Sequence, residues 1–170
     1  IKNHQKTKNY SNTGVQEIES YDLSKINSEN FILIEKALFN KDDLTLNFYK
    51  PKNPDHVSHS ISNFLNDHSI ETDHIKVKTI TLKTIMDKFK VSKLVLLKMD
   101  IEGAEIQVIE NMLENKIYPD QICVEFDELS KINKKTVENF FKIHKQLIDA
   151  NYILTKANKF PNMLYLLKND

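Results

Sequence analysis

A regular alternation of strand-like and helix-like segments fills the chain from residue 75 onward. The strand-like runs are 75–80, 93–99 and 121–126, and the last two are almost continuously aliphatic. Strand–helix–strand repeats fold into right-handed parallel units, and continuous aliphatic strands are typical of sheets that are covered on both faces. The sequence therefore predicts an α/β fold built on a doubly wound, mostly parallel sheet.

Three amphipathic helices are predicted between and after these strands, the first beginning behind Thr81, which suits a helix N-cap. The stripes are Leu82, Ile85, Met86 and Phe89; Val108, Ile109, Met112 and Leu113; and, within about 134–150, Val137, Phe140, Phe141, Leu147 and Ile148. The chain then continues with YILTK and MLYLLK, joined across ANKFPN. Since so short a connection cannot make a crossover, we expect these two strands to pair antiparallel at the sheet edge.

The N-terminal part of the chain is less regular. Residues 1–30 are polar and show no apolar periodicity. FILIEKALF at 31–39 predicts a buried strand, LTLNFY at 44–49 predicts an alternating strand, and NKDD between them suits a hairpin connection. We therefore expect a polar segment over 1–30 and a single α/β domain over 31–170.

Charge and cysteine content narrow the functional classes. The 24 basic residues, all of them lysine, balance 24 acidic residues, so an electrostatic grip on nucleic acid or on anionic lipid is not expected. The longest apolar runs are about half a membrane span, so no transmembrane helix is expected. One cysteine, Cys123, allows no disulfide within the chain, and a reducing cytoplasm is the expected location.

The stretch KMDIEGAEIQVIENML, residues 98–113, concentrates acidic side chains directly after a predicted strand. Ligands of open α/β sheets bind at the carboxyl ends of the strands, which is where Asp100 lies, and Gly103 allows a sharp bend there. Glu105 shares a helix face with Ile109 and Met112, so we expect it to point inward. However, acids at a helix start gain about 0.3–1 kcal/mol each from the helix dipole, and spacing alone favours this capping role.

The stretch LVLLKMDIEGAEIQVIENM resembles the hallmark of the FkbM-type methyltransferases, an aliphatic strand followed by Lys, an apolar residue, Asp, an apolar residue, Glu, Gly, a small residue and Glu. FILIEKALFNKDDLTLNFY, VSHSISNF, IKVKTITLKTIMDKF, QICVEFDE and NMLYLLKN resemble further parts of the family in the same order, so the resemblance covers about 30–168. It implies a Rossmann-like class I methyltransferase sheet with an antiparallel C-terminal hairpin. It also implies S-adenosyl-L-methionine as cofactor and a sugar or other small-molecule hydroxyl as acceptor.

The same resemblance implies a set of site residues. These are Asp100, Glu102, Glu105 and Glu125 for catalysis, and Lys36 and Ala37 for the adenine side of the cofactor. Asp100 would orient the acceptor or take its hydroxyl proton, Glu102 and Glu105 would shape the site, and Glu125 would flank it. Alternatively, Asp100 and Glu125 could hold a hard divalent cation that lowers the pKa of the hydroxyl. None of the expected site residues is expected to be a metal ligand.

One part of the family pattern is missing from the sequence. Class I methyltransferases hold the cofactor with a glycine-containing loop after the first strand, but the only glycines here are Gly14 and Gly103, and no apolar strand precedes Gly14. We therefore expect the first two strands to lie upstream of Ile1, which would make this chain the C-terminal two-thirds of the domain and a poor cofactor binder alone. The alternative is a non-catalytic methyltransferase-like fragment that serves as a binding or assembly module.

Histidines and serines outside the acidic stretch give weaker signals. His56 and His59 have a spacing that occurs in zinc sites, although no cysteine accompanies them. Ser58, Ser60 and Ser62, in the same segment, could contact cofactor or acceptor, or only satisfy backbone turns. A metal-dependent hydrolase using the same acids lacks a histidine beside them.

Overall fold

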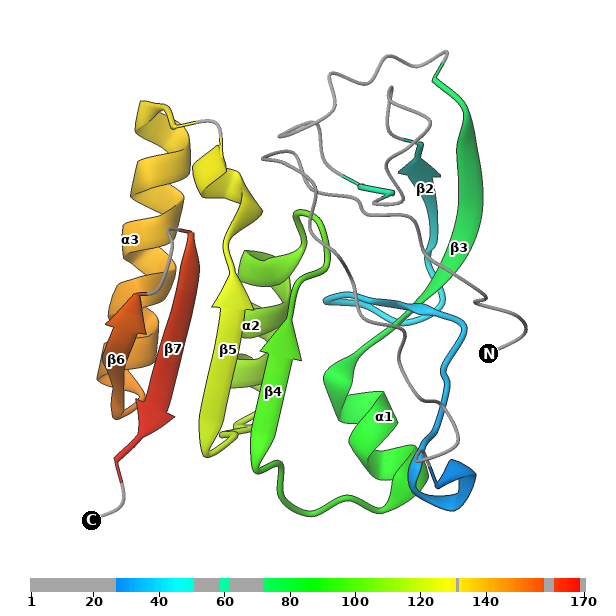
Figure 1. The fold of residues 1–170 in the computed structure, drawn as a ribbon, viewed down its shortest axis with the longest axis horizontal. Helices are drawn as coiled ribbons and strands as arrows, with labels where there is room; N and C mark the ends of the chain where they lie inside the picture. The colour runs from blue at the N-terminus through cyan, green and yellow to red at the C-terminus, as the bar shows by residue number, and fades with distance from the viewer. Residues whose placement is uncertain (1–26, 51–58, 62–71, 131, 158–160, 169–170) are drawn as a thin grey trace.

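The computed structural model describes residues 27–50, 59–61, 72–130, 132–157 and 161–168. These residues form an α/β arrangement with two mixed β-sheets and three α-helices (Figure 1). The predicted α/β class is confirmed. Nearly all of the predicted polar segment over 1–30 lies outside the described residues, apart from a short 3-10 turn at Ser28–Asn30.

The larger sheet has four strands in the order β4-β5-β7-β6. Its strands are β4 (Leu96–Met99), β5 (Gln121–Glu125), β6 (Tyr152–Ala157) and β7 (Asn162–Leu167). β4 and β5 run parallel, whereas β7 pairs antiparallel with both β5 and β6, which confirms the predicted C-terminal hairpin. The expectation of a mostly parallel sheet is wrong for the described residues, because the hairpin inserts β7 between β5 and β6.

The smaller sheet has the order β1-β3-β2, with β1 (Ala37–Leu38), β2 (Thr45–Tyr49) and β3 (His74–Ile80). The strands β2 and β3 are confirmed, but the predicted hairpin between 31–39 and 44–49 is wrong, since β1 and β2 both pair with β3 and not with each other. The predicted buried strand over 31–39 is also wrong, because only two of its residues pair and Leu33 is 61% exposed. An aliphatic run signals burial only where a partner strand lies beside it.

The core lies between the larger sheet and the helices α2 (Glu105–Glu114) and α3 (Lys134–Asp149), which cover one face of that sheet (Figure 1). Its most deeply buried side chains include Met99, Ile109, Met112, Ile122, Phe126, Ile143, Leu147 and Tyr165. On the opposite face Leu96 is 53% exposed, although Leu97 next to it is buried. The expectation of a sheet covered on both faces is therefore wrong for β4, within the described residues.

The start of α1 follows the predicted capping chemistry. Thr81 precedes α1 (Leu82–Phe89), and its hydroxyl accepts a hydrogen bond from the amide of Thr84 at 3.1 Å, as expected. Asn133 and Thr136 form a capping box at the start of α3. The predicted stripe of α3 is correct at Phe140 and Leu147.

Two residues of that stripe are placed differently. Phe141 and Ile148 are exposed, and Ile143 takes the buried position instead. The positions 140, 143 and 147 follow the 3.6-residue period, whereas 141 and 148 are each rotated about 100° from a buried neighbour.

Candidate active site

The chain turns sharply between β4 and α2, and residues 100–105 are called the acidic turn from here on. Glu102 and Gly103 both have positive φ, 60° and 106° respectively. Gly103 tolerates this conformation because it has no Cβ, whereas an L-residue such as Glu102 adopts it at a cost of about 1–2 kcal/mol. Positive φ also occurs at Asp43, Lys90, Lys116 and Asn151, so the backbone makes the acidic turn a candidate site only together with its acidic side chains.

Glu105 holds the acidic turn together from inside. Its side chain is fully buried, as predicted, and its carboxylate accepts hydrogen bonds from the amides of Ile101 at 2.9 Å and Gly103 at 3.1 Å. Ala104 at the N-cap of α2 offers no side-chain acceptor to the first turn of the helix. Burial raises the pKa of Glu105 to about 7 despite the bonds from the amides, and the charge of Glu128 adds to this effect.

A cavity of about 350 Å³ opens between the acidic turn and the smaller sheet. Its walls include Lys36, Ala37, Phe39, Leu46, Phe48, His59, Ile61, Asp100, Ile101 and Glu102. Four of the six site residues expected from the sequence, namely Lys36, Ala37, Asp100 and Glu102, therefore line one cavity although more than sixty positions separate the two pairs. The volume falls within the range of small-molecule sites.

Asp100 is reachable from solvent at the edge of this cavity. Its side chain is half-exposed, and its Oδ2 atom lies 3.2 Å from the Nζ atom of Lys98. Lys36, on the facing wall, pairs with Asp43 at 2.7 Å. Because both ion pairs are exposed, they orient the side chains more than they stabilise the fold.

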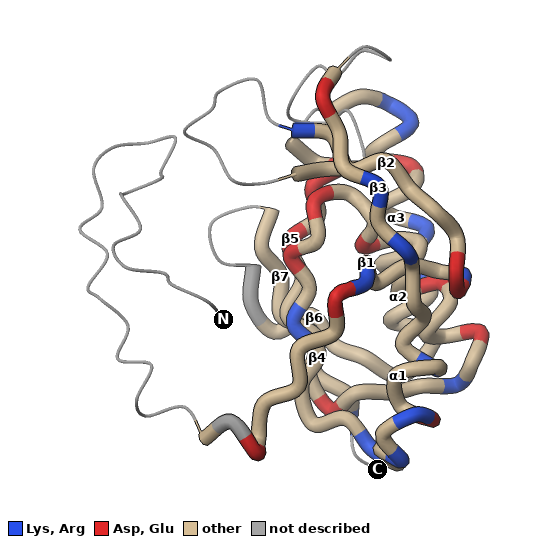
Figure 2. Tube along the Cα trace, turned by 90° about the vertical axis from the view of Figure 1, so that its right-hand side faces the viewer, with Lys and Arg blue, Asp and Glu red and all other residues tan. Residues whose placement is uncertain are grey.

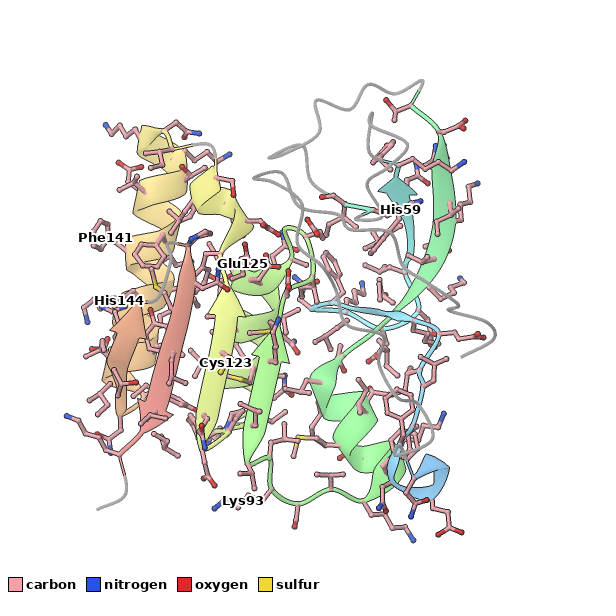
Figure 3. All side chains as sticks on the ribbon, in the orientation of Figure 1. His59, Lys93, Cys123, Glu125, Phe141 and His144 are labelled. Carbon is pink, nitrogen blue, oxygen red and sulfur yellow. The ribbon has the colours of Figure 1, made fainter. Side chains whose placement is uncertain are left out.

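Glu125 lies apart from Asp100. It ends β5 (Figure 3) and borders a different cavity, of about 200 Å³, on the open face of the larger sheet with Lys98, Cys123 and Asn162. Glu105 does not line the 350 Å³ cavity either. The structure thus brings Lys36, Ala37, Asp100 and Glu102 together and leaves Glu105 and Glu125 outside that wall.

Two buried acids that sequence reasoning overlooked follow β5 directly. Asp127 is 4% and Glu128 is 6% exposed, and Oδ2 of Asp127 and Oε2 of Glu128 have no hydrogen-bond partner among the described residues. Burial, followed by the charges of Glu105, Glu102, Glu125 and Asp100, raises the pKa of Asp127 to about 8. Burial likewise raises the pKa of Glu128. Figure 2 shows acidic positions gathered beside this end of β5.

The arrangement of acids gives no ready metal centre. Among the described residues, no group of three or more His, Cys, Asp and Glu side chains is placed to hold a metal ion. His59 lies beside β2 (Figure 3), while its predicted zinc partner His56 lies outside the described residues.

A comparison with protein families identifies the family of the chain. A model of the methyltransferase FkbM domain matches residues 5–154, which is most of the chain. The chain belongs to the FkbM methyltransferase family. The match confirms the family inferred from the acidic stretch, and it begins closer to the N terminus than the motif resemblance over 30–168 did.

Two further comparisons give no additional relatives of this FkbM domain. Neither the search of curated proteins nor the search of solved structures found a match. Within the described parts of the chain, no helix has the length and apolar character needed to cross a membrane.

Proposed function

We propose that this protein is an S-adenosyl-L-methionine-dependent methyltransferase that methylates a hydroxyl group of a small molecule. The reaction would take place in the 350 Å³ cavity beside the acidic turn. The observation that carries this proposal is the meeting of Asp100 and Glu102 with Lys36 and Ala37 in one cavity, within a chain of the FkbM family. We further propose the reducing cytoplasm as its location, which suits the single free cysteine, Cys123.

The cavity lining suits the chemistry of the cofactor. Phe39, Phe48 and Ile101 offer apolar and aromatic surface to an adenine ring. Carboxylates at Asp100 and Glu102 suit a donor that carries positive charge. When bound, S-adenosyl-L-methionine supplies an electrophilic methyl group.

Asp100 has the proposed catalytic role. Its carboxylate accepts the proton of the acceptor hydroxyl as the oxygen gains the methyl group, and the ion pair with Lys98 keeps the side chain at the cavity edge. Glu102 orients the acceptor from the same wall, which favours an in-line approach.

Glu105 and Glu125 are proposed to act indirectly, through other residues of the site. Glu105 positions the acidic turn through the amides of Ile101 and Gly103. Glu125 flanks the site through its charge, which contributes to the raised pKa of Asp127. Neither residue is expected to contact the reacting atoms.

The test compares two aspartates. Asp100→Asn should abolish transfer of a radiolabelled methyl group to a panel of sugar and small-molecule hydroxyl acceptors, while S-adenosylhomocysteine binding by calorimetry stays unchanged. Asp87→Asn is the matched control, since Asp87 is an exposed residue of α1 that pairs with Lys83. Unchanged turnover in Asp100→Asn would remove this residue from the mechanism. A wild-type chain that neither binds S-adenosylhomocysteine nor transfers the methyl group would contradict the function and favour the alternative, a non-catalytic fragment that serves as a binding or assembly module.

A further inference from the structure

Helix α3 buries one side against the larger sheet and carries an apolar stripe on its outer side. The stripe consists of Val137, Phe141, His144 and Ile148, and it is called the α3 seam here. Phe141 is 61% exposed, Ile148 is also exposed, and Val137 and His144 are half-buried. Figure 3 shows Phe141 and His144 on the side of α3 that faces away from α2. The α3 seam is therefore an apolar surface of the molecule and not part of its core.

The strand β6 adds one more apolar side chain to this surface. Among the described residues β6 is the last strand of the larger sheet (Figure 1), and its Leu154 lies directly opposite Tyr165 of β7. Residues that are directly opposite point to the same face of a sheet, and the hydroxyl of Tyr165 lies 2.8 Å from Nδ1 of His144. Leu154 is exposed, so it extends the α3 seam at the border of the helix-covered face.

The edge of β6 is itself poorly suited to bind another strand. The pairing of β6 with β7 shifts in register between Leu154 and Lys156, which is an irregularity of the kind that a β-bulge produces. Bulges twist an edge strand and oppose the addition of a further strand. A partner of this surface should therefore bind through the side chains of the α3 seam.

The spacing of the α3 seam is that of a coiled coil. Its successive residues are four, three and four positions apart, as are the core positions of a heptad repeat. This spacing is symmetric about the midpoint between Phe141 and His144. A second α3 that runs antiparallel across this midpoint therefore places Val137 opposite Ile148, and Phe141 opposite His144. The α3 seam is thus complementary to a copy of itself.

The charges beside the α3 seam favour the same arrangement. Glu138 and Lys145 are exposed, and each follows a residue of the seam, Val137 or His144, by one position. In an antiparallel pair of helices this flanking position meets its equivalent on the other helix, so Glu138 of each copy meets Lys145 of the other. Charged pairs at such positions set partner choice and orientation. A parallel pair would not bring these two charges together.

We propose that two copies of this chain form a symmetric dimer through the α3 seam, with their α3 helices packed antiparallel. Burial of Phe141, Ile148 and Leu154 removes apolar surface from water and so favours association. A two-fold contact of this kind uses the same surface on both copies, so association stops at the dimer. The reaction cavity lies beyond the tip of β4, at the opposite end of the sheet from β6, so the dimer leaves it open. The proposal therefore does not depend on the proposed function.

The first test measures the mass of the full chain by analytical ultracentrifugation from about 1 to about 300 µM, a range that suits a small interface. The wild type should pass from monomer to dimer, and Phe141→Ala should weaken dimerisation at least about tenfold, because large aromatic side chains at an interface carry much of the binding energy. Phe31→Ala is the matched control, since Phe31 is 49% exposed and lies outside the seam. Its dimerisation should equal that of the wild type.

Two results of this experiment would overturn the proposal. A monomer at every concentration would leave the α3 seam as a surface for a different protein. Equal weakening by Phe31→Ala and Phe141→Ala would mean that exposed apolar side chains associate without a defined interface. Far-ultraviolet circular dichroism checks that each variant is folded.

A charge exchange tests the antiparallel arrangement without removing an apolar side chain. Glu138→Lys should weaken dimerisation at least about fivefold, because it brings a second positive charge to Lys145 of the other copy. Adding Lys145→Glu to that variant should restore dimerisation. Glu114→Lys, at an exposed position at the end of α2, is the matched control and should have no effect. Absence of restoration in the double variant would overturn the proposal, since restoration requires that the two positions face each other across the interface.

Discussion

The hydroxyl of Ser60 donates a hydrogen bond to the backbone carbonyl of Glu102 over 2.6 Å. Ser60 is buried and pairs with Tyr49 at the end of β2, so this bond joins the smaller sheet to the acidic turn. The bond also holds the backbone of Glu102, whose φ is positive. Of the three serines that the sequence analysis singled out, Ser60 thus contacts a turn, while Ser58 and Ser62 lie outside the described residues.

Replacing this serine tests how much the bond between the sheet and the turn matters. Ser60→Ala should lower the free energy of unfolding by about 1 kcal/mol, because the hydrogen bond to Glu102 is lost. Ser92→Ala, at an exposed position between α1 and β4, should change it by less than about 0.5 kcal/mol. Urea denaturation followed by circular dichroism measures both. Equal effects of the two substitutions would show that the bond contributes nothing to stability.

Stability should fall as the pH rises, because buried acids keep their protons in the folded state. The pKa of Asp127 is raised to about 8 and that of Glu105 to about 7 in the folded state. The stability that each protonated group contributes is therefore fully present below its ordinary pKa, and it is lost as the pH rises through the folded pKa. The melting temperature should therefore decline from pH 5 to pH 9.

A pair of variants assigns this pH dependence. Asp127→Asn should flatten the decline in melting temperature, because an amide does not ionise. Asp87→Asn, on the exposed side of α1, should leave the slope unchanged. A wild-type melting temperature that rises over this pH range would contradict the assignment.

Asp42 should stabilise the start of α1 from outside the helix. Its carboxylate accepts hydrogen bonds from the amide of Thr81 at 2.8 Å and the hydroxyl of Thr84 at 2.8 Å. Burial acts to raise the pKa of Asp42, but these bonds outweigh it and hold the pKa below its usual value. Asp42→Ala should cost about 1–2 kcal/mol at pH 7, measured by urea denaturation. Asp73→Ala, at an exposed aspartate paired with Lys50, is the control and should cost little.

The contribution of Asp42 to stability should also depend on pH. Since its folded pKa is depressed, its stabilising effect is present above the ordinary pKa and is lost as the pH falls through the folded value. The stability difference between wild type and Asp42→Ala should therefore shrink below about pH 4. A constant difference down to pH 2 would exclude the charge of Asp42 as the cause.

The backbone at Glu102 offers a test that is independent of its charge. Glu102→Gly and Glu102→Ala both remove the carboxylate, but only glycine lacks the Cβ that opposes a positive φ. The glycine variant should be more stable than the alanine variant by about 1 kcal/mol in urea denaturation. An alanine variant of equal or greater stability would mean that the turn relaxes to another conformation.

The elements that sequence patterns predicted correctly are those decided by neighbouring residues. Thr81 caps α1 because the acceptor and the amide lie three residues apart, and the short connection before β7 forces an antiparallel hairpin. The failures concern partners that are distant in the sequence. Nothing in FILIEKALF indicates that only Ala37 and Leu38 find a neighbouring strand, and nothing in β4 indicates that Leu96 faces an open side.

In the candidate site, too, the features set by neighbouring residues were predicted and those set by distant partners were not. Asp100 and Glu102 follow a predicted strand, so their place at its carboxyl end could be inferred, and Lys36 and Ala37 came from family resemblance. Their shared cavity depends on how the two sheets are placed, and their roles stay predictions. Asp127 and Glu128 were missed because two acids after a strand usually indicate a solvated loop, whereas here a 3-10 turn buries both.

One wall of the reaction cavity comes from the smaller sheet and its neighbouring residues, and the other comes from the acidic turn that follows β4 of the larger sheet. Substitutions in β2 can therefore reshape one wall without shifting the tip of β4, where Asp100 lies. A family that must accommodate different molecules can vary the first wall freely and keep the second unchanged. For protein engineering, Leu46 and Phe48 are accordingly the first positions to diversify when a new substrate preference is sought.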